Sequence, residues 1–434
     1  MSETPRPDGA AGTPAATPAD APAATPAGAP VQAPGAGAPA DGPAPPSDAS
    51  SQRRRWSGQR PPWRRRWVVN LAVAAVVVVA GLLVADHVDL NSYVLTPGDA
   101  QPVGPLLKVP AGKAHHVRGA VLLTDVYVTR VTALNYLRFE LDGNAKMITA
   151  TTILGPNTPP AQMLTQGYLE MAQSQSAAKA AALTRLGFHV PGRATGTLVF
   201  GVQPGSPASR VLEVGQVVTA VGRTPTPDTC AFLRAVAPKV PGDVVDLTVQ
   251  ENRVTSRATQ VIGRTVHERV RLRSWPTSVA RPSTPTTCSG TIPTPRAYLG
   301  VEVETQQDFT FPFPVSIRTS TIGGPSAGLA MTLGLIDTLT DGHLTGGMRV
   351  AATGTIDPKG NVGAVGGVPQ KTVAVERAGA TVFFVPSGNR TTARSKADPS
   401  LHVYAVTSLG QVLAILHRLG GTVPPKAQAA ASAS

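Results

Sequence analysis

The chain is 434 residues long, carries a net charge of +13 and contains only two cysteines. Its length allows two or three domains of ordinary size. Two cysteines without clustered histidines argue against a structural zinc site, so we expect no metal and no cofactor.

The first 66 residues are expected to form a disordered tail. Residues 1–52 consist almost entirely of Ala, Pro, Gly, Thr, Ser and Asp and include no aromatic residue. Such a composition cannot bury enough apolar surface to offset the entropy lost on folding. An arginine-rich cluster follows, from Arg53 to Arg66, and ends the tail.

Residues 67–85 predict one transmembrane helix. The stretch WVVNLAVAAVVVVAGLLVA has Asn70 as its only polar side chain. At about 1.5 Å per residue, a helix of this length comes close to spanning the ~30 Å hydrocarbon core of a bilayer. A cleaved signal peptide would need a shorter apolar run followed by a small-x-small cleavage site, so we expect a retained anchor.

The arginine cluster predicts the orientation of this helix. Positive charge is enriched on the cytoplasmic side of membrane helices. We therefore expect a cytoplasmic N-terminus, with residues 88–434 outside the cytoplasm. Arginine clusters also occur at nucleic-acid sites, but the position beside the apolar run explains this one more simply, so we expect no nucleic-acid partner.

Residues 88–185 are expected to be a linker and a small mixed α/β module. The β-branched stretch 120–131 predicts a strand, and the glycine-poor stretch 163–186 predicts a helix that Gly187 ends. We identify no catalytic chemistry in this part of the chain.

Residues 186–264 predict a β-rich domain with a short helix between its first two strands and a second helix that starts in residues 227–238. The stretches PGSPA and EVGQVVTAVGRTPT resemble PDZ domains of membrane-associated bacterial proteases. The resemblance implies that a bound peptide adds a strand beside the strand that contains Leu198 and Phe200, with its carboxylate held by the preceding loop. The alternative is a β-rich spacer without a ligand.

Two further segments connect or end the domains. Residues 265–295 become rich in Pro, Ser and Thr towards their end and predict a linker, and residues 420–434 predict a second disordered tail. Cys230 and Cys288 lie on the side of the membrane where disulfides persist. The sequence leaves open whether they pair.

Residues 296–419 predict an α/β domain, since apolar strands alternate with helices. The predicted strands are 297–304, 313–317, 349–356 and 381–386, and the predicted helices are 326–339, 369–378 and 408–419. Ser408 and Gln411 form a possible capping box for the last helix.

The first of these helices starts in the sequence TIGGPSAGLAMTL, which contains Ser326. Serine after proline is typical of an ordinary helix start, where the hydroxyl caps the helix. The alternative is a nucleophile, which would need a base to take its proton. Gly324 and Pro325 would then let the chain turn sharply and leave room for a substrate carbonyl.

Lys371 is the best candidate for that base. Of the three lysines in this domain, Lys359 lies in a predicted turn and Lys396 in a polar loop, where both should stay charged. Lys371 lies in the first turn of a helix, among apolar residues. Partial burial and the positive end of the helix dipole both favour its neutral form.

Three stretches together resemble the peptidase domain of the Lon protease family. They are GGPSAG around Ser326, ATGTIDPKGNVGAVGGVPQK ending at Lys371, and ERAGATVFFVPSGN after it. The resemblance implies that Ser326 is the nucleophile, Lys371 the general base and Thr353 a hydrogen-bond partner of the lysine. The order of helix, PDZ and peptidase over residues 67–419 is similar to membrane-anchored, PDZ-containing Lon-like serine proteases of bacteria.

The sequence contains no G-x-x-x-x-G-K-[ST] phosphate loop. We therefore expect an endopeptidase that cuts unfolded or extended polypeptides without ATP. The alternative is a membrane-tethered PDZ scaffold that binds polypeptides without cutting them. The resemblance to Lon also implies a possible homo-oligomer.

Overall fold

A computed structural model describes residues 62–154, 159–281, 288–319 and 321–425. Most of the tail predicted over residues 1–66, and the end of the tail predicted over residues 420–434, lie outside these ranges. The chain divides into two units at Trp67. Apart from the start of the first helix, the elements below belong to the second unit.

Helix α1, Pro62–His87, contains the apolar stretch predicted over residues 67–85. Its part from Arg66 to His87 is 22 residues long, and the most apolar 18 residues within it have a mean hydropathy of 2.8. By length and composition alone, this helix can cross a membrane.

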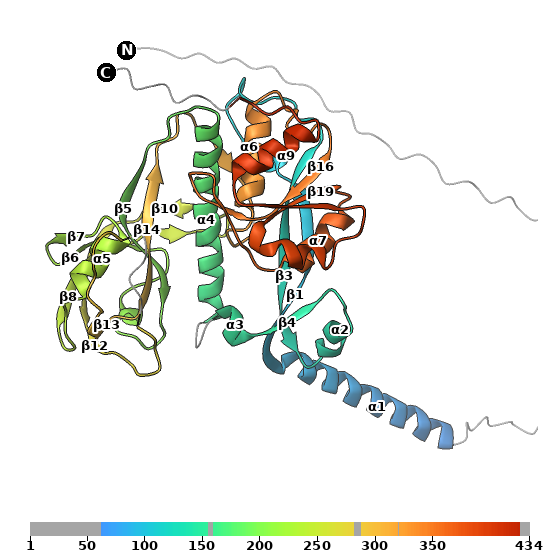
Figure 1. The fold of residues 1–434 in the computed structure, drawn as a ribbon. Coiled ribbons are helices and arrows are strands. Elements are labelled where there is room, and N and C mark those ends of the chain that lie inside the picture. The colour runs from blue at the N-terminus through green and yellow to red at the C-terminus, as the bar shows by residue number, and fades with distance from the viewer. Residues whose placement is uncertain (1–61, 155–158, 282–287, 320, 426–434) are drawn as a thin grey trace, which may run out of the picture. The chain divides into compact units, whose positions relative to one another are not determined.

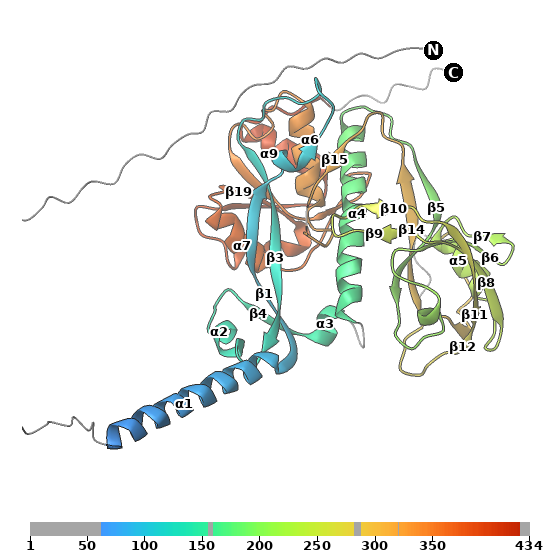
Figure 2. The same cartoon turned by 180° about the vertical axis from the view of Figure 1, so that it is seen from behind.

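A six-stranded sheet forms the centre of the α/β part of the chain (Figure 1). In spatial order its strands are β20 (His402–Val406), β19 (Val382–Pro386), β16 (Arg349–Ala352), β3 (Ala120–Thr132), β1 (Asp89–Pro102) and β4 (Lys146–Thr149). The strands from β20 to β3 are parallel neighbours, whereas β1 is antiparallel to both β3 and β4. Figure 2 shows β1 and β3 as two long strands that lie side by side.

Helices cover both faces of this sheet. They are α4 (Pro160–Arg185), α6 (Gly328–Leu339), α7 (Val368–Arg377), α8 (Arg390–Arg394) and α9 (Leu409–Arg418). Leu123 of β3 shares a core with α4, α6 and α9, whereas its neighbour Leu122 shares another core with α7 and α8. Because successive side chains of a strand point to opposite faces, the sheet lies between two helical layers. The predicted α/β class is confirmed.

This sheet is built from strands of two segments that the sequence analysis predicts to be separate domains. Strands β1, β3 and β4 come from the predicted small module of residues 88–185, and β16, β19 and β20 come from the predicted peptidase domain. Their pairing gives the two segments one sheet and a shared core. The small module is therefore part of the α/β domain, because β3 supplies the hydrogen-bonding edge that β16 needs.

Short elements complete this domain. They are η1 (Gly104–Leu106), β2 (Leu107–Lys108), α2 (Tyr136–Glu140), α3 (Ala150–Leu154), β15 (Ser316–Ile317), β17 (Thr355–Ile356), β18 (Val362–Gly363) and η3 (Ser387–Asn389). The capping box predicted for α9 forms, but one of its two hydrogen bonds involves a neighbouring residue. Ser408 accepts the N–H of Gln411, but the Gln411 side chain accepts the N–H of Thr407 rather than that of Ser408.

The β-rich domain has a second sheet with its own apolar core. In spatial order its strands are β11 (Thr265–Arg271), β8 (Val244–Gln250), β6 (Val217–Val221), β5 (Gly192–Val202) and β14 (Val301–Phe309), with β7 (Thr224–Pro225) beside β6. Its remaining elements are η2 (Ala208–Arg210), helix α5 (Thr229–Val236), the pair β9 (Arg253–Val254) and β10 (Gln260–Val261), and the pair β12 (Arg273–Ser274) and β13 (Ala297–Tyr298).

Both predicted boundaries of the linker 265–295 differ from those in the structure. Strand β11 begins at Thr265 and pairs with β8, so the β-rich sheet continues past residue 264. Strand β14, expected in the peptidase domain, pairs with β5 along nearly its whole length. The alternating β pattern of residues 297–304 predicts a strand but not its partner, because the pattern carries no information about which sheet it joins.

Candidate active site

Ser326 lies in the loop before α6 and does not cap that helix. The helix starts at Gly328, two residues later than predicted, and its N-cap position is Ala327, without a side-chain cap. The Ser326 hydroxyl is therefore not bound to the helix end, and the capping alternative is not what the structure shows.

The conformation of Gly324 and two hydrogen bonds with helix α4 hold this loop in place. Gly324 has φ of +86°, a left-handed conformation that disfavours any residue with a Cβ. Helix α4 fixes the same loop from outside, since the Gly324 N–H donates to Gly167 O at 2.8 Å and Ser174 Oγ donates to Pro325 O at 3.0 Å. The helix in which the sequence shows no chemistry thus positions the loop of Ser326.

Lys371 and Thr353 meet Ser326 from two other elements. Lys371 Nζ, from the first turn of α7, lies 2.6 Å from Ser326 Oγ and 3.2 Å from Thr353 Oγ1. Thr353, directly after β16, donates its hydroxyl proton to Ser326 O at 3.2 Å. The three residues that the sequence singles out are therefore brought together, and Gly324 and Pro325 lie next to them.

Burial sets the charge state of Lys371. Its side chain is 2% exposed, and burial lowers its pKa from 10.5 to about 8, while the charge of Asp125 acts in the opposite direction. A buried ammonium lacks the hydration that stabilises it in water. Roughly a tenth of the lysine is therefore neutral at pH 7 and about half at pH 8.

Asp125 is a charged neighbour of Lys371 that the sequence analysis did not identify. It lies on β3, and its Oδ1 accepts the N–H of Asp99 at 2.6 Å, while Tyr127 Oη donates to Asp99 Oδ2 at 2.6 Å. Burial raises the pKa of Asp125, and the Asp99 N–H acts against this rise. A Cβ at Gly98 would lie 2.1 Å from Asp125 Oδ1, so glycine is needed there. The signal available in the sequence was a single carboxylate within an apolar strand.

These carboxylates do not form a metal site. In the described ranges, no group of three His, Cys, Asp or Glu side chains lies close enough together to hold a metal ion. The polar groups that the structure does bring together here are the hydroxyls of Ser326 and Thr353 and the amine of Lys371.

The predicted peptide site at Leu198 and Phe200 needs correction. At Leu198, strand β5 is paired on both edges, with β6 through Val217 and with β14 through Glu304. Leu198 is also fully buried, and the carbonyl of Phe200 accepts the amide of Gln166. A peptide cannot add to an edge that is already paired.

Strand β14 is one of the two edge strands of this sheet in the described part of the chain, and β11 is the other. An apolar groove runs between β14 and α5, with Phe232 and Val236 on the helix side and Leu299, Val301 and Val303 on the strand side.

The two cysteines are joined. A disulfide links Cys230, in α5, to Cys288, in the segment before β13, with their Cα atoms 5.5 Å apart. The pairing that the sequence left open is therefore present, and it ties this segment to the helix that borders the groove.

Comparison with known families finds a match to one segment of the α/β part. Residues 317–418 match the Lon protease (S16) C-terminal proteolytic domain. The chain is 38% identical over 96 residues to the Lon protease of Koribacter versatilis, covering 21% of this chain and 12% of that protein. It is 46% identical over 63 residues to the Lon protease of Clostridioides difficile, covering 14% of this chain and 8% of that protein. The chain thus matches only a small part of these longer relatives.

Solved structures similar to this chain include two PDZ domains of SdrC-like proteins. The one from Listeria monocytogenes is 15% identical, with a TM-score of 0.18, over 25% of this chain and 87% of that domain. The one from Listeria innocua is 16% identical, with a TM-score of 0.17, over 25% of this chain and 92% of that domain.

The matched residues 317–418 include the loop of Ser326, the strand end at Thr353 and helix α7 with Lys371. The three side chains that meet in space thus all come from the segment that the family comparison identifies. Residues 317–418 of this chain are therefore similar to the C-terminal proteolytic domain of Lon proteases (S16).

Proposed function

We propose that the protein is a membrane-anchored endopeptidase that cleaves unfolded or extended polypeptides through a Ser326–Lys371 dyad, without ATP. The observation that carries the proposal is the 2.6 Å contact between Lys371 Nζ and Ser326 Oγ within a Lon-like proteolytic domain. A buried lysine with a pKa of about 8 supplies the neutral amine that activates a serine.

The reaction begins with proton transfer. Neutral Lys371 takes the hydroxyl proton of Ser326 as Oγ attacks the substrate carbonyl, and the ammonium then gives a proton to the leaving amine. Water hydrolyses the acyl-enzyme with Lys371 again as the base. Thr353 keeps the amine directed at Ser326, because its hydroxyl oxygen accepts from Nζ and its proton is bound to Ser326 O.

Backbone N–H groups near Ser326 are suited to stabilise the oxyanion. The N–H groups of Gly324, Gly328 and Leu329 are bound to Gly167, Pro325 and Gly354 respectively. Within the described part of the chain, those of Ser326 and Ala327 make no hydrogen bond. They lie at the N-terminal end of α6, where the helix dipole also favours negative charge.

The decisive experiment uses the full chain in detergent or nanodiscs. We expect it to cleave an unfolded polypeptide in nucleotide-free buffer, with no increase on addition of ATP and Mg²⁺. Ser326→Ala and Lys371→Met should both abolish cleavage without a change in thermal melting. Cleavage by either variant at the rate of the unmodified protein would refute the dyad, and cleavage only with ATP would refute ATP independence.

We further propose that the β-rich domain recruits polypeptides through the groove between α5 and β14. A free strand edge beside an apolar groove is suited to an added strand, whose side chains enter the groove. Val303→Lys should weaken binding of an extended peptide to the Ser326→Ala variant, and Val261→Lys, on β10, is the control. If the protein binds peptides through this groove but never cuts them, the scaffold alternative is correct.

Membrane anchoring through α1, with the N-terminus in the cytoplasm, is part of the proposal. Its support is the length and hydropathy of α1 and the arginines before it. In sealed inverted membrane vesicles, added protease should leave residues 88–434 intact. Digestion of residues 88–434 in sealed vesicles would show that α1 has the opposite orientation.

A further inference from the structure

A short loop of the α/β domain exposes several large apolar side chains. We call residues 134–141, which include α2, the apolar loop. Its exposed side chains are Leu134 (45%), Tyr136 (43%), Leu137 (64%) and Leu141 (77%). Leu141 is the most exposed large apolar side chain in the described part of the chain. Soluble surfaces rarely gather such residues without a partner.

The apolar loop is bonded to the end of α1. The N–H of Leu134 donates to Ala85 O at 3.2 Å, and the N–H of Ala133 donates to Val88 O at 3.0 Å. Ala85 is the last residue of the apolar run, and Asp86 and His87 follow it. If α1 spans a bilayer, Ala85 lies at the level where hydrocarbon ends, and the loop bonded to it lies at that level too.

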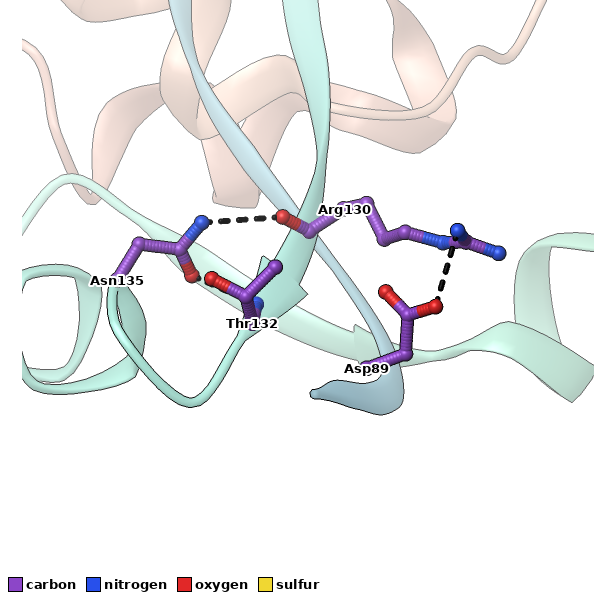
Figure 3. Close-up of polar contacts among 4 residues, drawn as sticks. All are labelled: Asp89, Arg130, Thr132 and Asn135. Atoms are coloured by element: carbon purple, nitrogen blue, oxygen red, sulfur yellow. Dashed lines mark hydrogen bonds and ion pairs between the residues drawn. The ribbon is translucent and has the colours of Figure 1, made fainter. Parts of the chain in front are cut away.

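Polar contacts hold the base of the apolar loop in one conformation. Figure 3 shows the side chain of Asn135 between two backbone groups, accepting the N–H of Thr132 at 2.8 Å and donating to Arg130 O at 3.2 Å. The Arg130 side chain forms an ion pair with Asp89, just beyond α1, at 3.0 Å. The exposed apolar side chains therefore stand on a fixed base rather than on an unsupported turn.

We propose that the apolar loop inserts into the headgroup region of the bilayer that α1 spans, so that the catalytic domain contacts the lipid surface directly. The proposal rests on the anchoring through α1 proposed above. Leucines and a tyrosine suit this depth, where amphipathic segments bury one side at the acyl boundary. Arg138 and Lys146 lie beside them, exposed. Glu140 and Asp142 are exposed there too and offset this positive charge, so the insertion rests on the apolar side chains and not on attraction to the headgroup phosphates.

The contact has a structural consequence. A domain joined to a membrane by a single helix end can rotate about that end, whereas a second contact restricts this rotation. The sheet would then be held in one orientation through β1 and β3, because β1 follows α1 and β3 leads into the apolar loop.

The test uses the full chain in nanodiscs of phosphatidylcholine and phosphatidylglycerol. Single cysteines are introduced at Leu137, Val77 or Ile262 and labelled with a nitroxide, while Cys230 and Cys288 stay joined in their disulfide. Ile262 is 71% exposed and lies just after β10, so it is the matched control for an exposed apolar site. Relaxation of the label by oxygen and by a water-soluble nickel complex reports its depth in the bilayer.

We expect Leu137 to show several-fold more protection from nickel than Ile262, and Val77 to show the most. If Leu137 matches Ile262 while Val77 is protected, the apolar loop stays in water and the inference is overturned, although the anchor stands. If Val77 is open to nickel, the anchoring itself fails. Spin–spin broadening at Leu137 that also appears in detergent would identify a second copy of the chain as the occupant and overturn the lipid assignment.

Discussion

Lys371 Nζ lies 2.6 Å from Ser326 Oγ, although the two residues are 45 positions apart in the chain. The contact joins the loop before α6 to the first turn of α7. Nothing in either local sequence requires it, and the sheet between these helices is what brings the two side chains together.

The pH dependence of cleavage should follow this contact. Since only neutral Lys371 accepts the proton of Ser326, kcat/KM should rise about tenfold per pH unit below the pKa and level off above about 8. Measurement of kcat/KM from pH 6 to pH 10 checks this. A profile that is flat between pH 6.5 and pH 9 would contradict lysine as the base.

Asp125→Asn should shift that profile to lower pH. The charge of Asp125 raises the pKa of Lys371, so its removal favours the neutral amine and should increase kcat/KM at pH 7 a few-fold. Tyr127→Phe is the control, because it removes the hydrogen bond to Asp99 but keeps both carboxylates. An unchanged midpoint in Asp125→Asn would show that its charge does not reach the lysine.

Thr353→Val should reduce kcat with little change in KM. Valine fills the same space but neither accepts from Lys371 Nζ nor donates to Ser326 O, so the amine loses its alignment. We expect a loss of roughly ten- to a hundredfold, less than the 10²–10⁴-fold that a positioned proton transfer typically contributes, because Lys371 itself remains. Thr353→Ser should retain most of the rate, and equal losses in both variants would indicate packing instead.

Asp337→Asn should stabilise the protein at neutral pH. Burial raises the pKa of Asp337 to about 6, while the N–H of Leu344 acts against the rise. The folded state therefore holds this proton more tightly than the unfolded chain. The stability that this bound proton gives to the folded state is fully present below the unfolded pKa of Asp337, near 4, and is lost as pH rises through about 6.

Asparagine avoids this loss and keeps an oxygen for the Leu344 N–H, which Asp337 Oδ1 accepts at 3.0 Å. The Tm of Asp337→Asn should exceed that of the unmodified protein at pH 7.5, and the two should converge towards pH 4. Asp337→Ala, which leaves the Leu344 N–H unpaired, should melt lower at both pH values. Convergence at pH 7.5 rather than at pH 4 would contradict the sign of the effect.

The sequence predicts the local features of the fold well. The helix expected over residues 163–186 is α4, Pro160–Arg185, and the strand expected over residues 120–131 is β3, Ala120–Thr132. Hydrophobic period and turn residues carry this information along the chain. Ser326, Thr353 and Lys371 were singled out together through the resemblance to the Lon peptidase domain, because the sequence around Ser326 alone also suits a helix cap.

The features that were missed depend on contacts between distant segments. Gly167 O holds the N–H of Gly324, and Asp125 acts on Lys371, yet each pair is separated by more than 150 residues. Likewise, the strand pattern of β14 does not reveal that β5 is its partner. The periodicity of a single sequence does not show which distant segments lie next to each other. Gly167 and Asp125 could therefore be placed beside the site only from the structure.

The split of the catalytic sheet also determines when the site can form during synthesis. Strand β3 ends at Thr132, but its parallel partner β16 begins only at Arg349, and Lys371 follows later still. A chain that emerges N-terminus first makes α1 and its entire β-rich domain before the residues that complete this sheet. The contact between Ser326 and Lys371 can therefore form only after the β-rich domain has been made, and a chain that stops before Lys371 lacks the base of the proposed dyad.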